Sequence, residues 1–318
     1  MKLGPGPEFD RIRMMLQRLG PDAESIGDDC AVIPEGVGSL VLSADLAVEG
    51  VHFRRDWLSL EEIGWRAAAA ALSDLAAEGA AVVGVLASLG VPADAAVDAP
   101  ADVMGGVHAA VRAVGGRVLG GDLSRGTHWL INITVLGRAV RPVTRAGARP
   151  GDQLWVTGSL GGPRAGLAAL LRGDTPSAEA RAAFARPVPR VTCGQALARA
   201  GATAMLDLSD GLAGDAGHLA AASSLALHIQ LLQLPIAGAV LSEATRAGVA
   251  PAVFGALGGE DYELLAVLPP SFGGSEAADV RRETGVALTL IGECRAGSGV
   301  HLLAGEKAVT LHGFDHFA

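Results

Sequence analysis

The chain has 318 residues, which corresponds to about two domains of roughly 150 residues each, and half of the residues are hydrophobic. The net charge of −9 argues against a nucleic-acid partner, because nucleic-acid-binding surfaces use basic side chains to neutralise phosphates. The lysines, Lys2 and Lys307, lie near the chain ends, which disfavours Schiff-base chemistry and a P-loop. Cationic roles are therefore left to arginine and bound metal.

The first half of the chain predicts alternating helices and strands. Apolar residues at helical spacing predict a helix over 8–19, and short strands are expected over 30–33 and 39–44. Ser59, followed by acidic residues in the next turn, begins a helix that runs to about residue 78 and contains Asp74. The remaining elements of this half are a strand over 82–89, a helix over 101–113, a strand over 117–119 that stops at Gly120, and a strand over 131–136.

The segment 138–152, rich in Arg, Pro and Gly, predicts the passage into a second domain, with boundaries at 1–142 and 143–318. The elements expected beyond it are a strand over 153–156, a Gly-rich loop over 158–162, a helix ending near residue 171, a helix after the Pro-rich connection 187–189, and a strand over 204–206. Strands that end in Gly or Asp are typical of ligand-binding loops in α/β folds. The fold class is therefore a layered α/β protein of two domains.

Neither a targeting peptide nor a membrane segment is predicted. The composition of 1–16 fits no signal or transit peptide, and the longest apolar stretch, 80–91, is shorter than the ~20 residues that span a bilayer. Cys30, Cys193 and Cys294 are too widely spaced for a disulfide framework or a zinc knuckle, and they suit a reducing compartment. We expect a cytoplasmic protein.

Aspartates recur at the ends of these predicted elements. A single Asp after a strand is most often a helix cap or a turn former. Asp74 is different, because Ala67, Ala70 and Ala71 make its helix face small and the segment 67–81 contains no Lys, Arg or His. A buried carboxylate needs a partner. A metal ion or an arginine from elsewhere in the chain must supply it.

The sequence Asp-Leu-Ser-Asp-Gly at 207–211 brings more side-chain oxygens to a helix start than one cap requires. Oxygen ligands of this kind select Mg²⁺ or Mn²⁺ over zinc. The glycines at 120–121 and 158–162 offer backbone N–H groups to a phosphate, although turns explain most such runs. Acidic ligands and Gly loops without a P-loop lysine indicate metal-assisted phosphoryl transfer with a nucleotide.

Six motifs, in order and at matching spacing along essentially the whole chain, resemble those of thiamine-monophosphate kinases. They are IGDDCA at 26–31, SAD at 43–45 with EGVHF at 49–53, LSDLAA at 72–77, GGD at 120–122, DLSDGL at 207–212 and GGEDYEL at 258–264. The tail GFDHF at 313–317 is also similar. The resemblance implies the two-domain fold of the aminoimidazole-ribonucleotide-synthetase-like superfamily, an N-terminal ATP- and metal-binding domain, and a homodimer with ATP near its interface.

The resemblance also implies ATP-dependent phosphorylation of thiamine monophosphate, assisted by several Mg²⁺ ions, and assigns roles by position. The implied metal ligands are Asp29, Ser43, Ala44, Asp45, Asp74, Asp122, Asp207 and Asp210, of which Asp29, Asp74, Asp122 and Asp210 would be catalytic. The implied ATP contacts are Gly121, Asp122, Arg145 and Ser209, and the implied substrate contacts are His52, Glu260 and Phe314. Ala44 departs from the Thr that is common in the family, so it could offer only its backbone carbonyl to a metal.

The chemistry agrees with these residues. The acceptor is a phosphate monoester whose second pKa is about 6, so no side-chain base is needed and direct transfer is expected. Structural roles compete for His52, Glu260 and Phe314, and Arg145 could equally solvate a linker. Selenophosphate synthetase is a rival, but its N-terminal segment needs a reactive Cys or selenocysteine and a Lys, and here that segment offers only Lys2. A catalytically inactive nucleotide-binding homologue is the other alternative.

Overall fold

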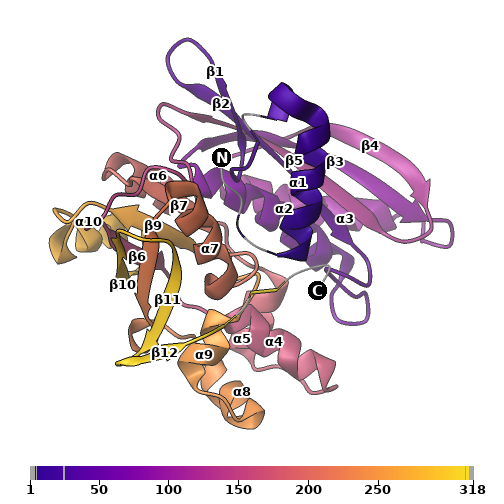
Figure 1. Ribbon diagram of the computed structural model, residues 1–318. Helices are drawn as coiled ribbons and strands as arrows, with labels where there is room; N and C mark the ends of the chain where they lie inside the picture. The colour runs from indigo at the N-terminus through magenta and orange to yellow at the C-terminus, as the bar shows by residue number, and fades with distance from the viewer. Residues whose placement is uncertain (1–3, 5, 24–25, 312, 315–318) are drawn as a thin grey trace.

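The structure is a computed structural model that describes residues 4, 6–23, 26–311, 313 and 314. It contains two β-sheets, each formed by one half of the chain and each covered by helices (Figure 1). This arrangement confirms the predicted layered α/β class. None of the described helices has the length and apolar character that crossing a bilayer requires.

The N-terminal sheet has the strand order β1-β2-β5-β3-β4. Its strands are β1 (Ala31–Pro34), β2 (Ser39–Val48), β3 (Ala81–Pro92), β4 (Val118–Gly126) and β5 (Leu130–Ala139). β3 and β4 pair in parallel, and the other neighbours are antiparallel. Helices α2 (Leu60–Ala77) and α3 (Ala99–Ala113) pack on one face, where Leu72, Val107 and Ile133 are fully buried.

Helix α2 begins as predicted. The Ser59 hydroxyl accepts a hydrogen bond from the Glu62 N–H, and the Glu62 carboxylate accepts one from the Ser59 N–H, which forms a capping box. Glycine permits α3 to approach closely, because a Cβ on Gly106 would lie 1.8 Å from the Glu61 carbonyl oxygen. α2 also contacts β2 and β5 of the sheet, and Asp74 lies in its last turns.

The C-terminal sheet has the strand order β12-β11-β8-β10-β6-β9-β7. Its strands are β6 (Gln153–Thr157), β7 (Ala204–Asp207), β8 (Ala226–Gln230), β9 (Leu264–Leu268), β10 (Leu288–Arg295), β11 (Gly299–Ala304) and β12 (Lys307–Val309). The helices of this half are α4 (Gly162–Leu171), α5 (Ala178–Ala185), α6 (Val191–Arg199), α7 (Leu212–Ser223), α8 (Val240–Ala247), α9 (Pro251–Ala256) and α10 (Gly274–Thr284). The side chains of α7 belong to one hydrophobic core cluster, whereas those of α6 and α10 belong to another.

The two halves share helix α2. Its residues Ala76 and Ala77 belong to the core cluster of α6 and α10, and a Cβ on Gly194 of α6 would lie 2.0 Å from the Ala76 carbonyl oxygen. Near its start, the Trp65 Nε1–H donates to the Pro187 carbonyl over 2.8 Å. The first helix, α1 (Pro7–Leu19), contacts α7 through the rings of Phe9 and His218, whose centroids are 4.2 Å apart.

The prediction that a strand stops at Gly120 is wrong, because β4 continues through Gly121 and Asp122 to Gly126. The reason is steric: a Cβ on Gly121 would lie 1.8 Å from the Ala87 carbonyl oxygen of β3, so glycine permits strand pairing here. β2 likewise continues past residue 44 to Val48. Asp45 therefore lies inside a strand.

Candidate active site

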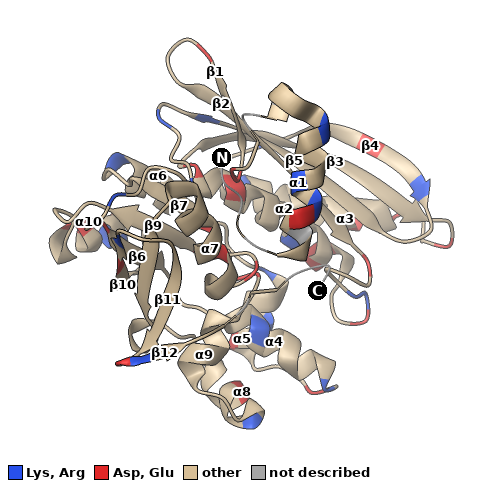
Figure 2. Ribbon diagram, viewed as in Figure 1, with Lys and Arg blue, Asp and Glu red and all other residues tan. Residues whose placement is uncertain are grey.

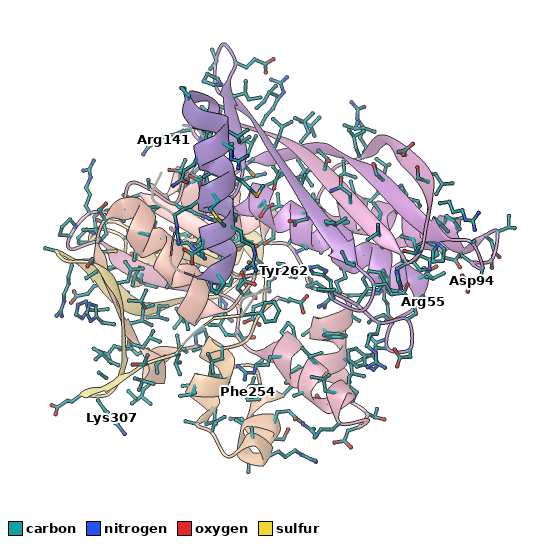
Figure 3. All side chains as sticks on the ribbon, turned by 45° about the vertical axis from the view of Figure 1, so that its right-hand side comes forward. Arg55, Asp94, Arg141, Phe254, Tyr262 and Lys307 are labelled. Atoms are coloured by element: carbon teal, nitrogen blue, oxygen red, sulfur yellow. The ribbon has the colours of Figure 1, made fainter. Side chains whose placement is uncertain are left out.

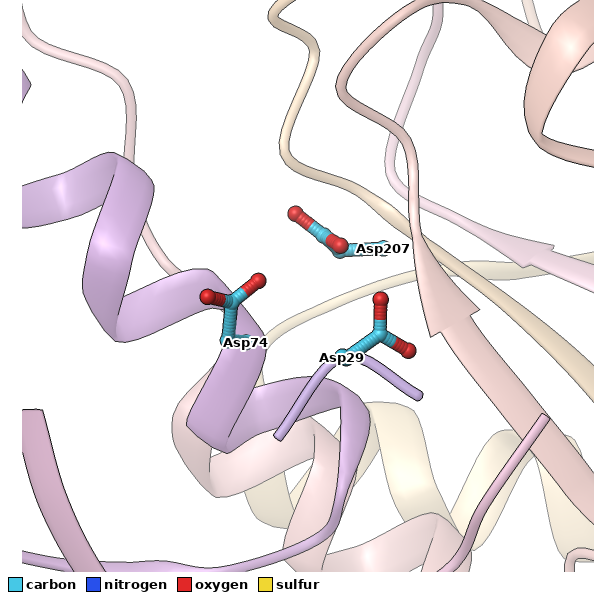
Figure 4. Close-up of side chains that lie close together, drawn as sticks. All are labelled: Asp29, Asp74 and Asp207. Carbon is cyan, nitrogen blue, oxygen red and sulfur yellow. The ribbon is translucent and has the colours of Figure 1, made fainter. Parts of the chain in front are cut away.

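Three aspartates that are distant in sequence meet where α2 faces the C-terminal half. Asp29 precedes β1, Asp74 belongs to α2, and Asp207 ends β7; one carboxylate oxygen from each lies within 4.8 Å of the other two (Figure 4). In Figure 2, acidic residues are seen in the region between α2 and α7. Closely spaced carboxylate oxygens are the ligands that hard divalent cations prefer.

Strand β2 contributes two more of the predicted side chains. The Ser43 hydroxyl donates to Asp74 Oδ2 over 2.5 Å. Asp45 pairs in register with Ile133, which is fully buried on the helix-covered face, so its side chain points toward α2. Ala44 lies between them and faces the opposite side of the sheet. Its methyl group therefore points away from the cluster.

The negative charge of the cluster is only partly compensated by neighbouring described residues. Burial, and then the neighbouring Asp29, raise the pKa of Asp45 to about 6 and that of Asp207 to about 7. Burial, followed by the charges of Asp45, Asp207 and Asp29, raises the pKa of Asp74 well above its usual value. Arg145 forms an ion pair with Asp29 and offsets part of this charge.

A divalent cation fits this donor set. Asp29 Oδ2 is buried and accepts no hydrogen bond from any described residue, although the other oxygen of the same carboxylate is held by Arg145. A buried carboxylate oxygen without a donor is costly, and a metal ion satisfies it. Asp28, by contrast, accepts hydrogen bonds from the backbone N–H groups of Asp29 and Arg145, which shapes the turn.

Two motifs of the C-terminal half are joined by backbone hydrogen bonds. The N–H of Glu260 donates to the Ser209 carbonyl over 2.7 Å, and the N–H of Tyr262 donates to the Leu208 carbonyl over 2.9 Å. Glu260 and Tyr262 have left-handed backbones, with φ of 63° and 49°. Such strain in non-glycine residues is common at functional sites. The pairing brings the segment 207–211 beside Glu260.

A cavity of about 890 Å³ opens beside the cluster and is lined by both halves of the chain. The predicted residues in its wall are Asp45, His52, Asp74, Asp207, Ser209, Asp210, Glu260 and Phe314. Asp29, Ser43, Ala44, Gly121, Asp122 and Arg145 are not among the described lining residues. The structure thus gathers most of the predicted metal and substrate residues around one cavity, and their roles remain predictions.

Part of the cavity wall consists of residues that were not predicted from the sequence. Phe53, Trp57, Phe184 and Tyr262 line it, as do Arg66 and Arg164. Tyr262 lies near the centre of the molecule, between its two halves (Figure 3). Helical spacing could have identified Arg66, because it precedes Asp74 by two turns on α2 and so shares its face. The aromatic residues carry no such signal.

Asp122 lies apart from the cluster within one chain. Its strand, β4, is separated from β2 by β5 and β3, which places the two strands about 14 Å apart at three strand spacings of ~4.8 Å. Across the sheet, Asp122 is in register with Ser88, Asn132 and Leu46. Asp45 is the residue before Leu46 in β2, so the two side chains point to opposite faces of the sheet. Asp122 is exposed, and the register places its side chain on the sheet face opposite to Asp45.

The Gly-rich loop over 158–162 does not offer the free N–H groups that were expected. The N–H groups of Gly158, Leu160 and Gly161 donate to the Ala287 carbonyl, the Pro235 carbonyl and Asp261 Oδ1, over 2.9, 2.8 and 2.8 Å. The expected phosphate contact at these groups is therefore wrong. Asp261 holds this loop in place.

Without a bound cation, the protein is expected to lose stability as the pH rises from about 5 to 9. Asp45, Asp207 and Glu78 have pKa values of about 6, 7 and 9, all above those of unfolded Asp and Glu. At low pH these three carboxyl groups are protonated in both the folded and the unfolded chain. Above roughly pH 4 the unfolded chain releases these protons first, so the free energy of unfolding falls until the folded pKa is passed.

The measurement is the melting temperature of chelator-treated protein at about pH 5.5 and pH 8.5, with Mg²⁺ added in parallel. The melting temperature should be lower at the higher pH, and Mg²⁺ should raise it most there. Glu78→Gln should flatten the upper part of the profile, because burial and the charges of Asp28 and Asp29 raise the pKa of Glu78. A profile that rises with pH would contradict the assignment.

Known proteins resemble this chain in sequence and in fold over nearly its whole length. The family model "AIR synthase related protein, N-terminal domain" matches residues 27–139, and its C-terminal counterpart matches 149–304. The thiamine-monophosphate kinase of Aquifex aeolicus is 32% identical over the full length of both chains. That of Escherichia coli (strain K12) is 38% identical, covering 98% of this chain and 96% of its own.

A solved structure described as AaThiL complexed with AMPPCP and TMP superimposes with a TM-score of 0.88 and 32% identity, covering 98% of this chain and 97% of its own. The expected superfamily fold is thereby confirmed. This protein belongs to the thiamine-monophosphate kinase family.

Proposed function

We propose that this protein transfers the γ-phosphoryl group of ATP to thiamine monophosphate and forms thiamine diphosphate. The observation that carries the proposal is the cluster of Asp29, Asp74 and Asp207 beside a large cavity. A carboxylate cluster that holds cations beside an aromatic-lined cavity suits the transfer of phosphate to an acceptor with a heterocycle. The names of the relatives and the ligands of the similar structure support the same reaction.

We assign Mg²⁺ to Asp29, Asp74 and Asp207, with Ser43, Asp45 and Asp210 beside them. Bound Mg²⁺ would neutralise phosphate charge and align the attacking and leaving oxygens. Ser43 orients the Asp74 carboxylate through its hydrogen bond, and Arg145 fixes one oxygen of Asp29. Any contribution of Ala44 comes from its backbone.

The acceptor needs no side-chain base, because its phosphate is largely ionised near neutral pH. We therefore propose direct transfer, with inversion of configuration at a chiral γ-phosphorus; retention would indicate a phosphoenzyme. His52, Glu260 and Phe314 are assigned to the acceptor. Arg145 and Ser209 are assigned to ATP, as are Gly121 and Asp122 of the partner chain in a homodimer.

The homodimer is proposed from the uncovered face of the N-terminal sheet. Leu46, Leu86 and Leu130 lie on that face and are 51%, 44% and 38% exposed. Exposed apolar side chains on one sheet face indicate a protein interface. Asp122 shares this face and would lie in the interface; we propose that it completes the site of the partner chain, because the cluster of its own chain lies on the other face of the sheet.

We further propose residues 1–142 as the ATP- and metal-binding domain, 143–318 as the second domain, and a cytoplasmic location. The three cysteines are free and buried, which suits a reducing compartment.

The test is to incubate purified protein with Mg-ATP and thiamine monophosphate and to separate the thiamine phosphates by chromatography. Stoichiometric formation of thiamine diphosphate and ADP is expected. Bound ATP without thiamine diphosphate would favour an inactive nucleotide-binding homologue. Consumption of ATP with selenide in place of thiamine monophosphate would favour the selenophosphate synthetase alternative.

A further inference from the structure

Arg66 is a buried arginine in the cavity wall, on the same helix as Asp74 and about two turns before it. The two residues are eight positions apart on α2, which corresponds to about 12 Å along the helix axis. Both line the cavity, and Ala70 between them adds little bulk. Helix α2 therefore spans the distance from the carboxylate cluster to a second polar position in the same cavity.

The guanidinium of Arg66 joins α2 to two segments of the C-terminal half. It donates a hydrogen bond to the Phe184 carbonyl, lies 4.3 Å from the centroid of the Phe184 ring, and forms an ion pair with Glu260. Its side chain is only 6% exposed. A buried guanidinium is costly unless it is paired. Here Nη1 donates the hydrogen bond to the Phe184 carbonyl, and Nη2 makes the charge contact with the Glu260 carboxylate without a hydrogen bond to a described residue.

Glu260 needs such support. Its backbone is left-handed, its N–H is committed to the Ser209 carbonyl, and its side chain is 27% exposed toward the cavity. A non-glycine residue keeps a left-handed conformation only where its surroundings enforce it. Arg66 is the described side chain that forms an ion pair with the Glu260 carboxylate.

We propose that Arg66 is a positioning residue: it holds Glu260 in the orientation in which its carboxylate faces the acceptor, and so sets the affinity for thiamine monophosphate. This inference rests on the proposed function. Because Arg66 lies about 12 Å along α2 from Asp74, its effect falls on the acceptor rather than on ATP.

The test is Arg66→Lys, with both substrates titrated separately. A lysine keeps the positive charge but cannot serve the Phe184 carbonyl and the Glu260 carboxylate in one plane. The KM for thiamine monophosphate should rise by about 10-fold or more, whereas the KM for ATP and the kcat should change by less than about threefold. If Arg66→Lys does not fold, Arg66→Gln is the second variant. It should likewise raise the KM for thiamine monophosphate much more than the KM for ATP.

The chain offers a matched control. Half-buried Arg190 forms an ion pair with buried Glu263, three residues after Glu260, at 2.6 Å, and neither residue lines the cavity. Arg190→Lys should lower the melting temperature without separating the two KM values. Absence of thiamine diphosphate with the wild-type protein would refute the proposed function itself. If the wild type is active, two results would overturn the role of Arg66. One is an equal change in both KM values for Arg66→Lys. The other is a selective rise of the KM for thiamine monophosphate in Arg190→Lys as well.

Discussion

Asp74→Asn is expected to lower the turnover of thiamine monophosphate by at least about 100-fold while the protein remains folded. Asp74 contacts Ser43 and contributes an oxygen to the same cluster as Asp29 and Asp207, so the amide removes a charged ligand from the centre of the proposed magnesium site. The fold should tolerate the change, because burial and like charges already disfavour the ionised carboxylate. The melting temperature of the metal-free variant should equal or exceed that of the wild type.

The measurements are kcat, and the increase in melting temperature on addition of Mg²⁺, for both proteins. Glu78→Gln is the matched control, since Glu78 is a buried carboxyl four residues further along and is not among the three clustered carboxylates. It should keep turnover within a few-fold of wild type. Near-normal turnover of Asp74→Asn, or an undiminished response to Mg²⁺, would show that the metal site has been assigned to the wrong residues.

Much of this site could be predicted because its signals are local. The start of α2 follows from Ser59 and the acidic turn after it, and the capping box in the structure bears this out. Asp207 was expected at the end of a strand, and β7 ends there. The meeting of Asp29, Asp74 and Asp207 could not be derived from spacing alone; the ordered motifs carried that expectation.

The incorrect predictions share a physical cause: the sequence does not show which segment packs against a glycine or which group accepts a hydrogen bond from a backbone N–H. Gly121 permits β4 to pair with β3, and the N–H of Gly161 is bound by a carboxylate from a distant motif. Glu260 is left-handed, although nothing in its residue type favours that conformation. These features depend on contacts between segments far apart in the chain.

Asp122→Asn is expected to lower turnover by at least about 100-fold, even though Asp122 lies on the opposite sheet face from Asp45 in its own chain. We attribute this to a homodimer in which each site combines Asp74 of one chain with Asp122 of the other. The two inactive variants should then complement each other when mixed.

Random exchange of Asp74→Asn and Asp122→Asn subunits makes about half of the dimers mixed, and each mixed dimer has one site with both native aspartates. About a quarter of wild-type activity should therefore return after co-refolding or co-expression. Mixing Asp74→Asn with Asp207→Asn is the control, because both residues belong to the cluster of a single chain and their mixed dimers contain no intact site. Exchanging the partner can restore only a residue that the partner supplies. Recovery of activity in the control mixture, or no recovery in the mixture with Asp122→Asn, would therefore contradict a site shared across the interface.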